Sequence, residues 1–237
     1  MKLVIFDLDD TLINTSDVYY RCREDFLSFL IKINNGYNIE YLRNVFEDID
    51  NKNIRFFGYT PWRYTYSMVE MYLNLVRKDH IKFAASYINQ ITQIGSRVIN
   101  EIPPLMPGAK HVLSTLKKKG YSLALLTRGE QTLQRQKIIH HGLEENFIQI
   151  AVVSQKTKRV FQSLISELGV NAKKAWSIGD SPKWDIFPAR EAGLNTLLVR
   201  YRHPAYEWAH EERHFVDGIA TVDNLEEIPR ILSNASR

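Results

Sequence analysis

The sequence predicts an α/β fold: an open, doubly wound parallel sheet with an all-helical region inserted after the first strand. Two observations predict this fold. Short apolar runs, typical of strands buried in a parallel sheet, alternate with amphipathic segments of helical periodicity. Residues 14–104 interrupt the alternation with helical patterns alone. Because strands that alternate with helices form parallel sheets with right-handed crossovers, we expect the core to be wound in this way.

Five apolar runs are the predicted strands of the sheet. They span residues 3–8, 122–127, 148–153, 175–180 and 195–199. Their length and nearly continuous apolar character suit strands that are covered on both faces. In an open sheet of this kind, ligands bind beyond the carboxyl ends of the strands. The residues that follow each run are therefore the first candidates for a functional site.

Three amphipathic segments connect the later strands, and each one stops at a glycine. They span residues 108–119, 130–141 and 157–168, and the next residue in each case is a glycine: Gly120, Gly142 and Gly169. Glycine is common at the end of a helix because it adopts the left-handed conformation without steric cost. These segments are the predicted crossover helices.

The inserted region is predicted to be helical throughout. Helical spacing is found in residues 17–34, 39–49, 62–78 and 81–102. Turn signals separate these segments, at the Asn-Gly pair of 35–36 and in the stretch 58–61, and the Pro-Pro pair of 103–104 marks the return to the core. The predicted domains are a core of 1–13 and 105–237 and a helical domain of 14–104.

Composition excludes several classes of protein. Hydrophobic residues make up 44% and charged residues 24%, as in a globular protein with a sizeable core. A single cysteine, Cys22, rules out an intramolecular disulfide and a cysteine-rich zinc cluster. The apolar run 3–6 is too short for a signal peptide or a membrane span, so a cytoplasmic location is expected. The net charge of +4 comes from bases scattered among acids, so neither nucleic acid nor a membrane is an expected partner. The oligomeric state stays open.

Acidic residues follow two of the predicted strands. Asp7 and Asp9 end the first run, and alternate residues of an extended segment point to the same side. Asp180 ends the fourth run, and Asp185 follows it closely. Carboxylates from two strand ends can meet around one hard cation, and Mg²⁺ suits such oxygen ligands. The plain alternative is that Asp180 or Ser181 only caps the next helix.

Two other strand ends carry groups suited to phosphate. Thr127, followed by Arg128 and Gly129, offers a hydroxyl and backbone N–H groups just before a helix, and helix N-termini bind anions. Lys156 follows the third strand and offers an ammonium group, although a solvated lysine is the plain alternative. Together, Asp, Thr, Lys and Asp at successive strand ends favour a site for a phosphorylated ligand.

These segments resemble the four motifs of the haloacid dehalogenase (HAD) superfamily of phosphohydrolases. The motif residues are 6–12, 125–129, 156–157 and 178–181 with Asp185. The resemblance covers roughly residues 1–13 and 105–225. It implies a Rossmann-like core, and it implies that the 14–104 insert is a C1-type helical cap.

The resemblance also implies the chemistry of the acidic residues. Asp7 is the expected nucleophile, which takes the phosphoryl group as an aspartyl phosphate. Asp9 is the expected general acid for the leaving alcohol, and then the base that activates water. The expected ligands of Mg²⁺ are Asp7, the backbone carbonyl of Asp9, and Asp180, with Asp185 supporting the metal directly or through water.

The resemblance assigns substrate binding to three further residues. Thr127 and Lys156 are expected to bind the transferring phosphoryl oxygens, and Arg128 is expected to bind substrate beside them. Arg128 departs from the family pattern, in which Asn or Lys is frequent at this place. Lys158 competes with Lys156 for its role, and we favour Lys156 because its Lys-Thr pair precedes the helix in the usual register.

The implied function is Mg²⁺-dependent hydrolysis of a small phosphate monoester, such as a nucleotide or a sugar phosphate. Asp9 favours ester hydrolysis over dehalogenation, because cleavage of a carbon–halogen bond needs no acid for the leaving group. Two alternatives stay open: a phosphomutase that uses the same aspartyl phosphate, and a binding protein that retains the fold without catalysis. The identity of the substrate also stays open.

The roles of two further segments stay open. The aromatic stretch with Tyr59, Trp62 and Tyr64 either contacts substrate or packs between helices, and Arg63 within it is a candidate for a second anionic group. Residues 201–210, rich in polar and aromatic side chains, are expected to form a solvated loop or to line the rim of the site.

Overall fold

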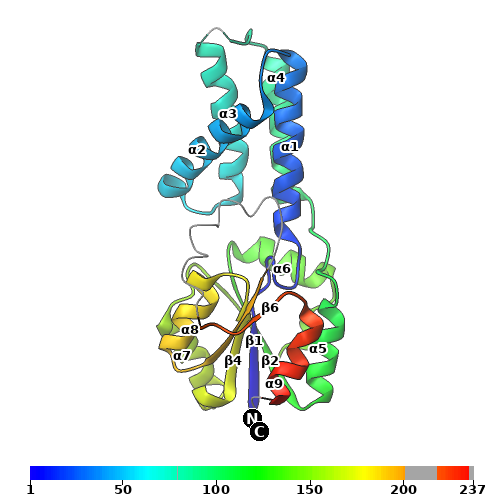
Figure 1. Cartoon of the computed structure of the whole chain (residues 1–237), viewed down its shortest axis with the longest axis vertical. Coiled ribbons are helices and arrows are strands. Elements are labelled where there is room, and N and C mark those ends of the chain that lie inside the picture. The colour runs from blue at the N-terminus through cyan, green and yellow to red at the C-terminus, as the bar shows by residue number, and fades with distance from the viewer. Residues whose placement is uncertain (79, 201–217, 235–237) are drawn as a thin grey trace. The chain divides into compact units, whose positions relative to one another are not determined.

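The computed structural model describes residues 1–78, 80–200 and 218–234, and it divides the chain into two compact units (Figure 1). The core unit joins Met1–Ser16 to Pro103–Arg237, and the helical unit is Asp17–Ile102. The stretch 201–210 lies outside the described residues.

The core unit is built on a parallel sheet. Its described strands are β1 (Lys2–Phe6), β2 (Tyr121–Arg128), β3 (Gln149–Val153), β4 (Ala175–Gly179), β5 (Asn195–Val199) and β6 (Thr221–Val222). They lie in the order β3-β2-β1-β4-β5-β6, and every neighbouring pair is parallel. The predicted α/β fold class is therefore confirmed. The short β6, which is only two residues long, was not predicted, because so brief a run carries no pattern of its own.

Helices cover both faces of this sheet (Figure 1). The α-helices of the core unit are α5 (Ala109–Lys118), α6 (Gln131–His140), α7 (Lys158–Glu167), α8 (Phe187–Glu191) and α9 (Ile228–Asn234). Successive residues of β1 point to opposite faces. Val4 and Phe6 pack in one apolar cluster with α5 and α9, while Leu3 and Ile5 pack in another with α7. From Leu3 to Phe6, β1 is therefore buried on both faces, and it supports the residues that follow it.

The helical unit contains four long helices. They are α1 (Thr15–Ile33), α2 (Ile39–Phe57), α3 (Pro61–Arg77) and α4 (Ala85–Asn100). Helix α2 continues well beyond the predicted 39–49, because its polar second half finds partners in α3. Asn53 donates hydrogen bonds to Ser67 and Glu70, and Asp50 accepts from Arg63 and Ser67. Tertiary contacts of this kind override local propensity.

The aromatic stretch of the helical unit is partly buried. Tyr64 is in the apolar core of the unit and donates a hydrogen bond to the carbonyl of Tyr19. Arg63 is only 4% exposed and forms an ion pair with Asp50, so its guanidinium takes part in packing within the unit. Tyr59 and Trp62 are exposed.

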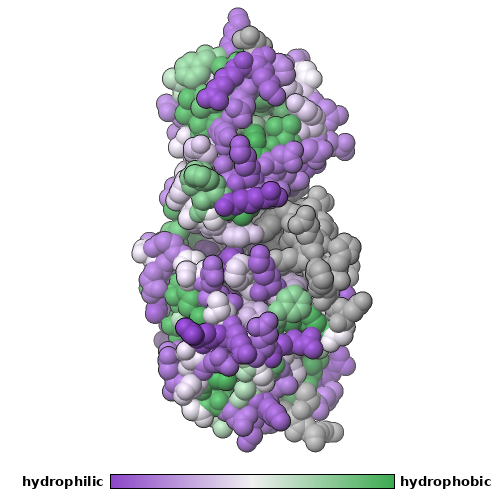
Figure 2. Space-filling view, turned by 90° about the vertical axis from the view of Figure 1, so that its left-hand side faces the viewer, coloured by the Kyte–Doolittle hydropathy of each residue, from purple (hydrophilic) through white to green (hydrophobic). Residues whose placement is uncertain are grey.

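One face of the molecule is shown in Figure 2. Hydrophilic side chains predominate on it, and separate hydrophobic areas lie between them. None of the described helices combines the length and apolar character that a membrane span requires.

Candidate active site at the carboxyl ends of the strands

A tight loop after β1 places Asp7 at the edge of the sheet. The backbone N–H of Asp7 donates to the carbonyl of Ile178 on β4, at 2.9 Å, which continues the pairing of the two strands. Asp10 then turns the chain with a φ of 57°, in the left-handed region that aspartate tolerates better than most residues. Its carboxylate accepts hydrogen bonds from the N–H and hydroxyl of Ser16, at 2.7 and 2.6 Å. Asp10 therefore fixes the loop to the start of α1.

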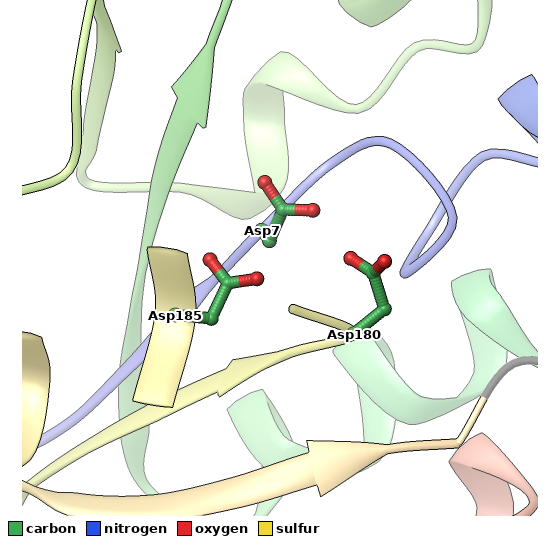
Figure 3. Close-up of side chains that lie close together, drawn as sticks. All are labelled: Asp7, Asp180 and Asp185. Carbon is green, nitrogen blue, oxygen red and sulfur yellow. The ribbon is translucent and has the colours of Figure 1, made fainter. Parts of the chain in front are cut away.

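Three aspartates converge beside this loop. Asp7, Asp180 and Asp185 each offer a carboxylate oxygen, and these oxygens all lie within 4.8 Å of one another. Figure 3 shows the three carboxylates, from the end of β1, the end of β4 and the turn after β4, directed toward a common space. Asp7 and Asp185 are buried, and Asp180 is half-buried. A compact set of hard oxygen donors fits Mg²⁺, so these residues suit the metal that the resemblance implies.

The position of Asp185 depends on a glycine at position 179, which has no side chain. Asp185 belongs to a π-helical turn, Pro182–Ile186, and a Cβ at Gly179 would lie 2.3 Å from the Cγ of Asp185. The carboxylate of Asp185 also accepts a hydrogen bond from the N–H of Ser181, at 3.1 Å. Gly179 is therefore required for space, since any side chain there would displace this carboxylate.

A buried lysine lies against two of the aspartates. Lys156, which is 3% exposed, donates to Oδ1 of Asp7 and to Oδ1 of Asp185, the latter at 2.5 Å. Lys158 is exposed at the start of α7. Of the two lysines that compete for this role, Lys156 is the one whose ammonium lies in the site.

Burial makes the acidic cluster hard to ionise. Burial, together with the nearby Asp185 and Asp9, raises the pKa of Asp7 to about 7, although Lys156 opposes the shift. Burial and the charges of Asp7 and Asp185 raise the pKa of Asp180 well above its ordinary value. Burial alone would lower the pKa of Lys156, but Asp185 and Asp7 raise it instead, so this lysine stays charged. One lysine thus faces three carboxylates, and a further cation would relieve their repulsion.

The metal-free protein is expected to lose stability as the pH rises toward neutrality. The pKa of Asp7 rises from 3.8 to about 7 on folding, so the folded state holds this proton more tightly. The stability that this group contributes is complete below pH 3.8 and is lost as the pH rises through about 7. We expect a loss of about 2 kcal/mol or more, measured by denaturant unfolding in EDTA at pH 5 and pH 7.5.

Excess Mg²⁺ should abolish most of that loss, because a bound cation favours the ionised carboxylates. Asp7→Asn is the control, since it removes the titrating group and should reduce the pH dependence in EDTA. An unchanged pH dependence in Asp7→Asn would show that the loss arises elsewhere in the molecule.

Asp9 lies in a second network, beside the acidic cluster. Its Oδ1 accepts hydrogen bonds from Lys137, at 2.7 Å, and from Thr15, at 2.5 Å. Its Oδ2 accepts a hydrogen bond from Nε2 of Gln134, at 2.7 Å. Burial alone would raise the pKa of Asp9, but the charge of Lys137 and these hydrogen bonds lower it. The side chain of Asp9 is thus directed to α6 and to Thr15.

Thr127 and Arg128 end β2 in different surroundings. Thr127 is fully buried, and its Oγ1 accepts a hydrogen bond from Gln134 at 2.6 Å, so this residue joins the network of Asp9. The guanidinium of Arg128 lies 4.3 Å from the centre of the Trp184 ring, in a cation–π contact.

Four residues with contacts in the site had no role in the sequence prediction. They are Thr11, Thr15, Gln134 and Lys137. Thr11 donates to Asp7 and lies at 3.3 Å from Asp180 as well, so it joins two of the aspartates. Gln134 and Lys137 are three residues apart, so they share one face of a helix. This spacing is the one signal in the sequence that could have indicated a common role.

Comparisons with known proteins identify a family and several relatives. A family model described as haloacid dehalogenase-like hydrolase matches residues 4–199. A glyceraldehyde 3-phosphate phosphatase of Pyrococcus furiosus is 24% identical over 245 residues, covering 100% of this chain and 94% of that protein. A phosphoserine phosphatase of Thermus thermophilus is 33% identical over 101 residues, covering 40% of this chain and 41% of that protein.

Two solved structures match nearly all of the chain. A haloacid dehalogenase-like family hydrolase of Xanthomonas campestris has a TM-score of 0.73 at 25% identity, covering 100% of this chain and 98% of that one. A HAD-hydrolase of Bacillus subtilis, solved with magnesium bound, has a TM-score of 0.64 at 21% identity and covers 98% of both chains. The second likeness supports the fold.

Proposed function

The chain belongs to the haloacid dehalogenase-like hydrolase family, and from that premise we propose that it hydrolyses a small phosphate monoester through an aspartyl phosphate on Asp7, with Mg²⁺ as its metal. The family predicted from the four motifs is confirmed. Relatives that match 98–100% of the chain are named as phosphatases, and the protein is accordingly a phosphoric monoester hydrolase. The observation that carries the mechanism is the buried carboxylate of Asp7, held between Lys156 and two further aspartates.

The first step transfers the phosphoryl group to the protein. A carboxylate oxygen of Asp7 attacks phosphorus, and the bond from phosphorus to the ester oxygen breaks. Asp9 must be protonated for this step, and it gives that proton to the departing oxygen, which leaves as an alcohol. Thr127 and Lys156 bind the phosphoryl oxygens, so that the developing negative charge lies beside a hydroxyl and an ammonium.

The second step releases phosphate. Asp9, now a carboxylate, takes a proton from water, and the water oxygen attacks phosphorus. The bond from phosphorus to the oxygen of Asp7 breaks, which regenerates the free carboxylate. Asp7, Asp180 and Asp185 are the side chains that would hold the metal. Its chemical contribution is to neutralise charge, so that an anionic carboxylate can approach an anionic ester.

A small phosphorylated metabolite is the proposed substrate. This class is supported by the names of the relatives, one of which acts on glyceraldehyde 3-phosphate and another on phosphoserine. The presence of Asp9, joined to Thr127 through Gln134, supports ester hydrolysis, because a general acid is useful only when the leaving group needs a proton.

The proposal is tested with p-nitrophenyl phosphate and a panel of phosphorylated metabolites. We expect turnover with Mg²⁺, loss of turnover in EDTA and recovery when Mg²⁺ is restored. Beryllium fluoride should inhibit, and rapid acid quenching should yield a phosphorylated peptide that contains Asp7. Metal-independent turnover, or a phosphoryl group on another residue, would overturn the mechanism. The absence of turnover over the whole panel would overturn the function.

A further inference from the structure

We propose that Gln134 and Lys137, on one face of α6, are positioning residues that fix the orientation of Asp9 for proton transfer. This inference rests on the proposed function, in which Asp9 serves the leaving group. It adds that the helix after β2, and not the loop after β1 alone, determines where the proton is delivered.

The geometry of Asp9 carries the proposal. Both of its carboxylate oxygens are engaged by α6, Oδ1 by the ammonium of Lys137 and Oδ2 by the amide of Gln134, each at 2.7 Å. Two contacts to different oxygens fix the rotation of the carboxylate as well as its position. Thr15 adds a third contact, to Oδ1. A carboxylate held at both oxygens presents a defined direction to a bound ester, and proton transfer depends on that direction.

Gln134 also connects Asp9 to the phosphate-binding group. Its Nε2 lies near three acceptors: Oδ2 of Asp9, Oγ1 of Thr127 at 2.6 Å, and the carbonyl of Arg128 at 3.1 Å. A carboxylate and a carbonyl can only accept, so the amide nitrogen must be the group that faces them. The hydroxyl oxygen of Thr127 therefore accepts from Gln134, which leaves its own proton for a phosphoryl oxygen. One amide thus sets the distance between the phosphoryl site and the proton donor.

Stability alone does not account for this arrangement. The side chains of Lys137 and Asp9 are 15% and 27% exposed, and ion pairs with such access to water contribute about 0–1 kcal/mol. Helix α6 buries only Gln134 and Ile138, and the first of these is polar. The inward side of α6 therefore combines Ile138, which packs in the apolar core, with a polar residue that contacts Asp9 and Thr127.

The test uses the dependence of turnover on the leaving group. An alkyl ester needs a proton on its departing oxygen, whereas p-nitrophenolate leaves without one. The quantity kcat/KM reports the steps up to phosphoryl transfer to Asp7, so only the alkyl ester should reveal a misplaced Asp9 in kcat/KM. The kcat for p-nitrophenyl phosphate also contains the hydrolysis of the aspartyl phosphate, in which Asp9 acts as the base.

Lys137→Met and Gln134→Met are measured as Mg²⁺-loaded proteins with p-nitrophenyl phosphate and with the alkyl phosphate that the wild type hydrolyses best. In both variants we expect kcat/KM for the alkyl ester to fall about tenfold or more. In Lys137→Met, kcat/KM for the aryl ester should stay within about twofold, and its kcat and KM should fall together. In Gln134→Met, kcat/KM for the aryl ester should fall as well, but by less than for the alkyl ester, because Thr127 loses a hydrogen bond too. Lys137→Arg should recover most of the alkyl activity, because it restores a cation that can donate to Asp9.

Lys118→Met and Gln136→Met are matched controls at exposed helix positions, and thermal unfolding checks that every variant is folded. An equal fall in kcat/KM for both esters would show a general structural role and overturn the inference. Unchanged or increased alkyl activity would overturn it as well, because Asp9 would then be independent of α6. If the wild type hydrolysed neither ester, the proposed function would fail, and the inference with it.

Discussion

Asp7→Asn is expected to lower kcat for every phosphate ester by about 10³-fold or more, with the fold intact. The amide of asparagine cannot take the phosphoryl group, and no other described carboxylate has the same contact with Lys156 on one oxygen and Thr11 on the other. Turnover is measured with Mg²⁺ on p-nitrophenyl phosphate, together with rapid-quench detection of the phosphorylated peptide.

The stability of Asp7→Asn distinguishes loss of chemistry from loss of structure. Burial raises the pKa of Asp7 to about 7, so at pH 7.5 its ionised carboxylate destabilises the metal-free folded state relative to the unfolded chain. A neutral asparagine should therefore leave the free energy of unfolding in EDTA unchanged or increase it. Asp48→Asn, at an exposed position of α2, is the matched control and should keep full activity. Full turnover by Asp7→Asn would show that Asp7 is not the nucleophile.

Lys156→Met is expected to cause the largest loss of stability, in addition to a loss of activity. Without Lys156, the buried carboxylates of Asp7 and Asp185 lose their shared cation. Removing one partner of a buried ion pair costs about 3–5 kcal/mol, which lowers the Tm of a chain of this size by about 10 °C. Turnover should also fall by about 10²-fold or more, because the phosphoryl oxygens lose their ammonium.

Lys158→Met is the matched control for this loss. It removes the same side chain two residues later, at an exposed position, and should leave both Tm and kcat unchanged. Mg²⁺ should raise the Tm of Lys156→Met by more than it raises that of the wild type, because the cation then relieves a greater repulsion. If Lys156→Met and Lys158→Met behaved alike, the ammonium of Lys156 would have no special part in the site.

The arrangement of the acidic site follows from features that a sequence can carry. Asp7 and Asp180 follow apolar runs, and in a parallel sheet the ends of such runs lie at one edge. The strand order places β1 between β2 and β4, so the residues after these three strands are neighbours although the chain separates them widely. The contact of Lys156 with Asp7 and Asp185 is a consequence of the same topology.

The part of the site that lies on α6 could not be predicted in this way. Gln134 and Lys137 belong to a short polar segment, and polar residues on a helix are usually solvated. Their function depends on the turn at Gly129, where the side chain of Gln134 packs so closely that a Cβ would lie 3.2 Å from it. The continuation of α2 to Phe57 was missed for a related reason, since the partners of Asp50 and Asn53 are in another helix.

The contact between Gly179 and Asp185 bears on which cation the protein selects. The side chain of Asp185 lies against the main chain at Gly179, in the space that a Cβ would occupy, which restricts its movement toward that strand. A larger ion such as Ca²⁺ takes six to eight oxygens at longer distances and needs a site that can expand. We expect the close contact at Gly179 to oppose such an expansion, and therefore to favour Mg²⁺ over Ca²⁺.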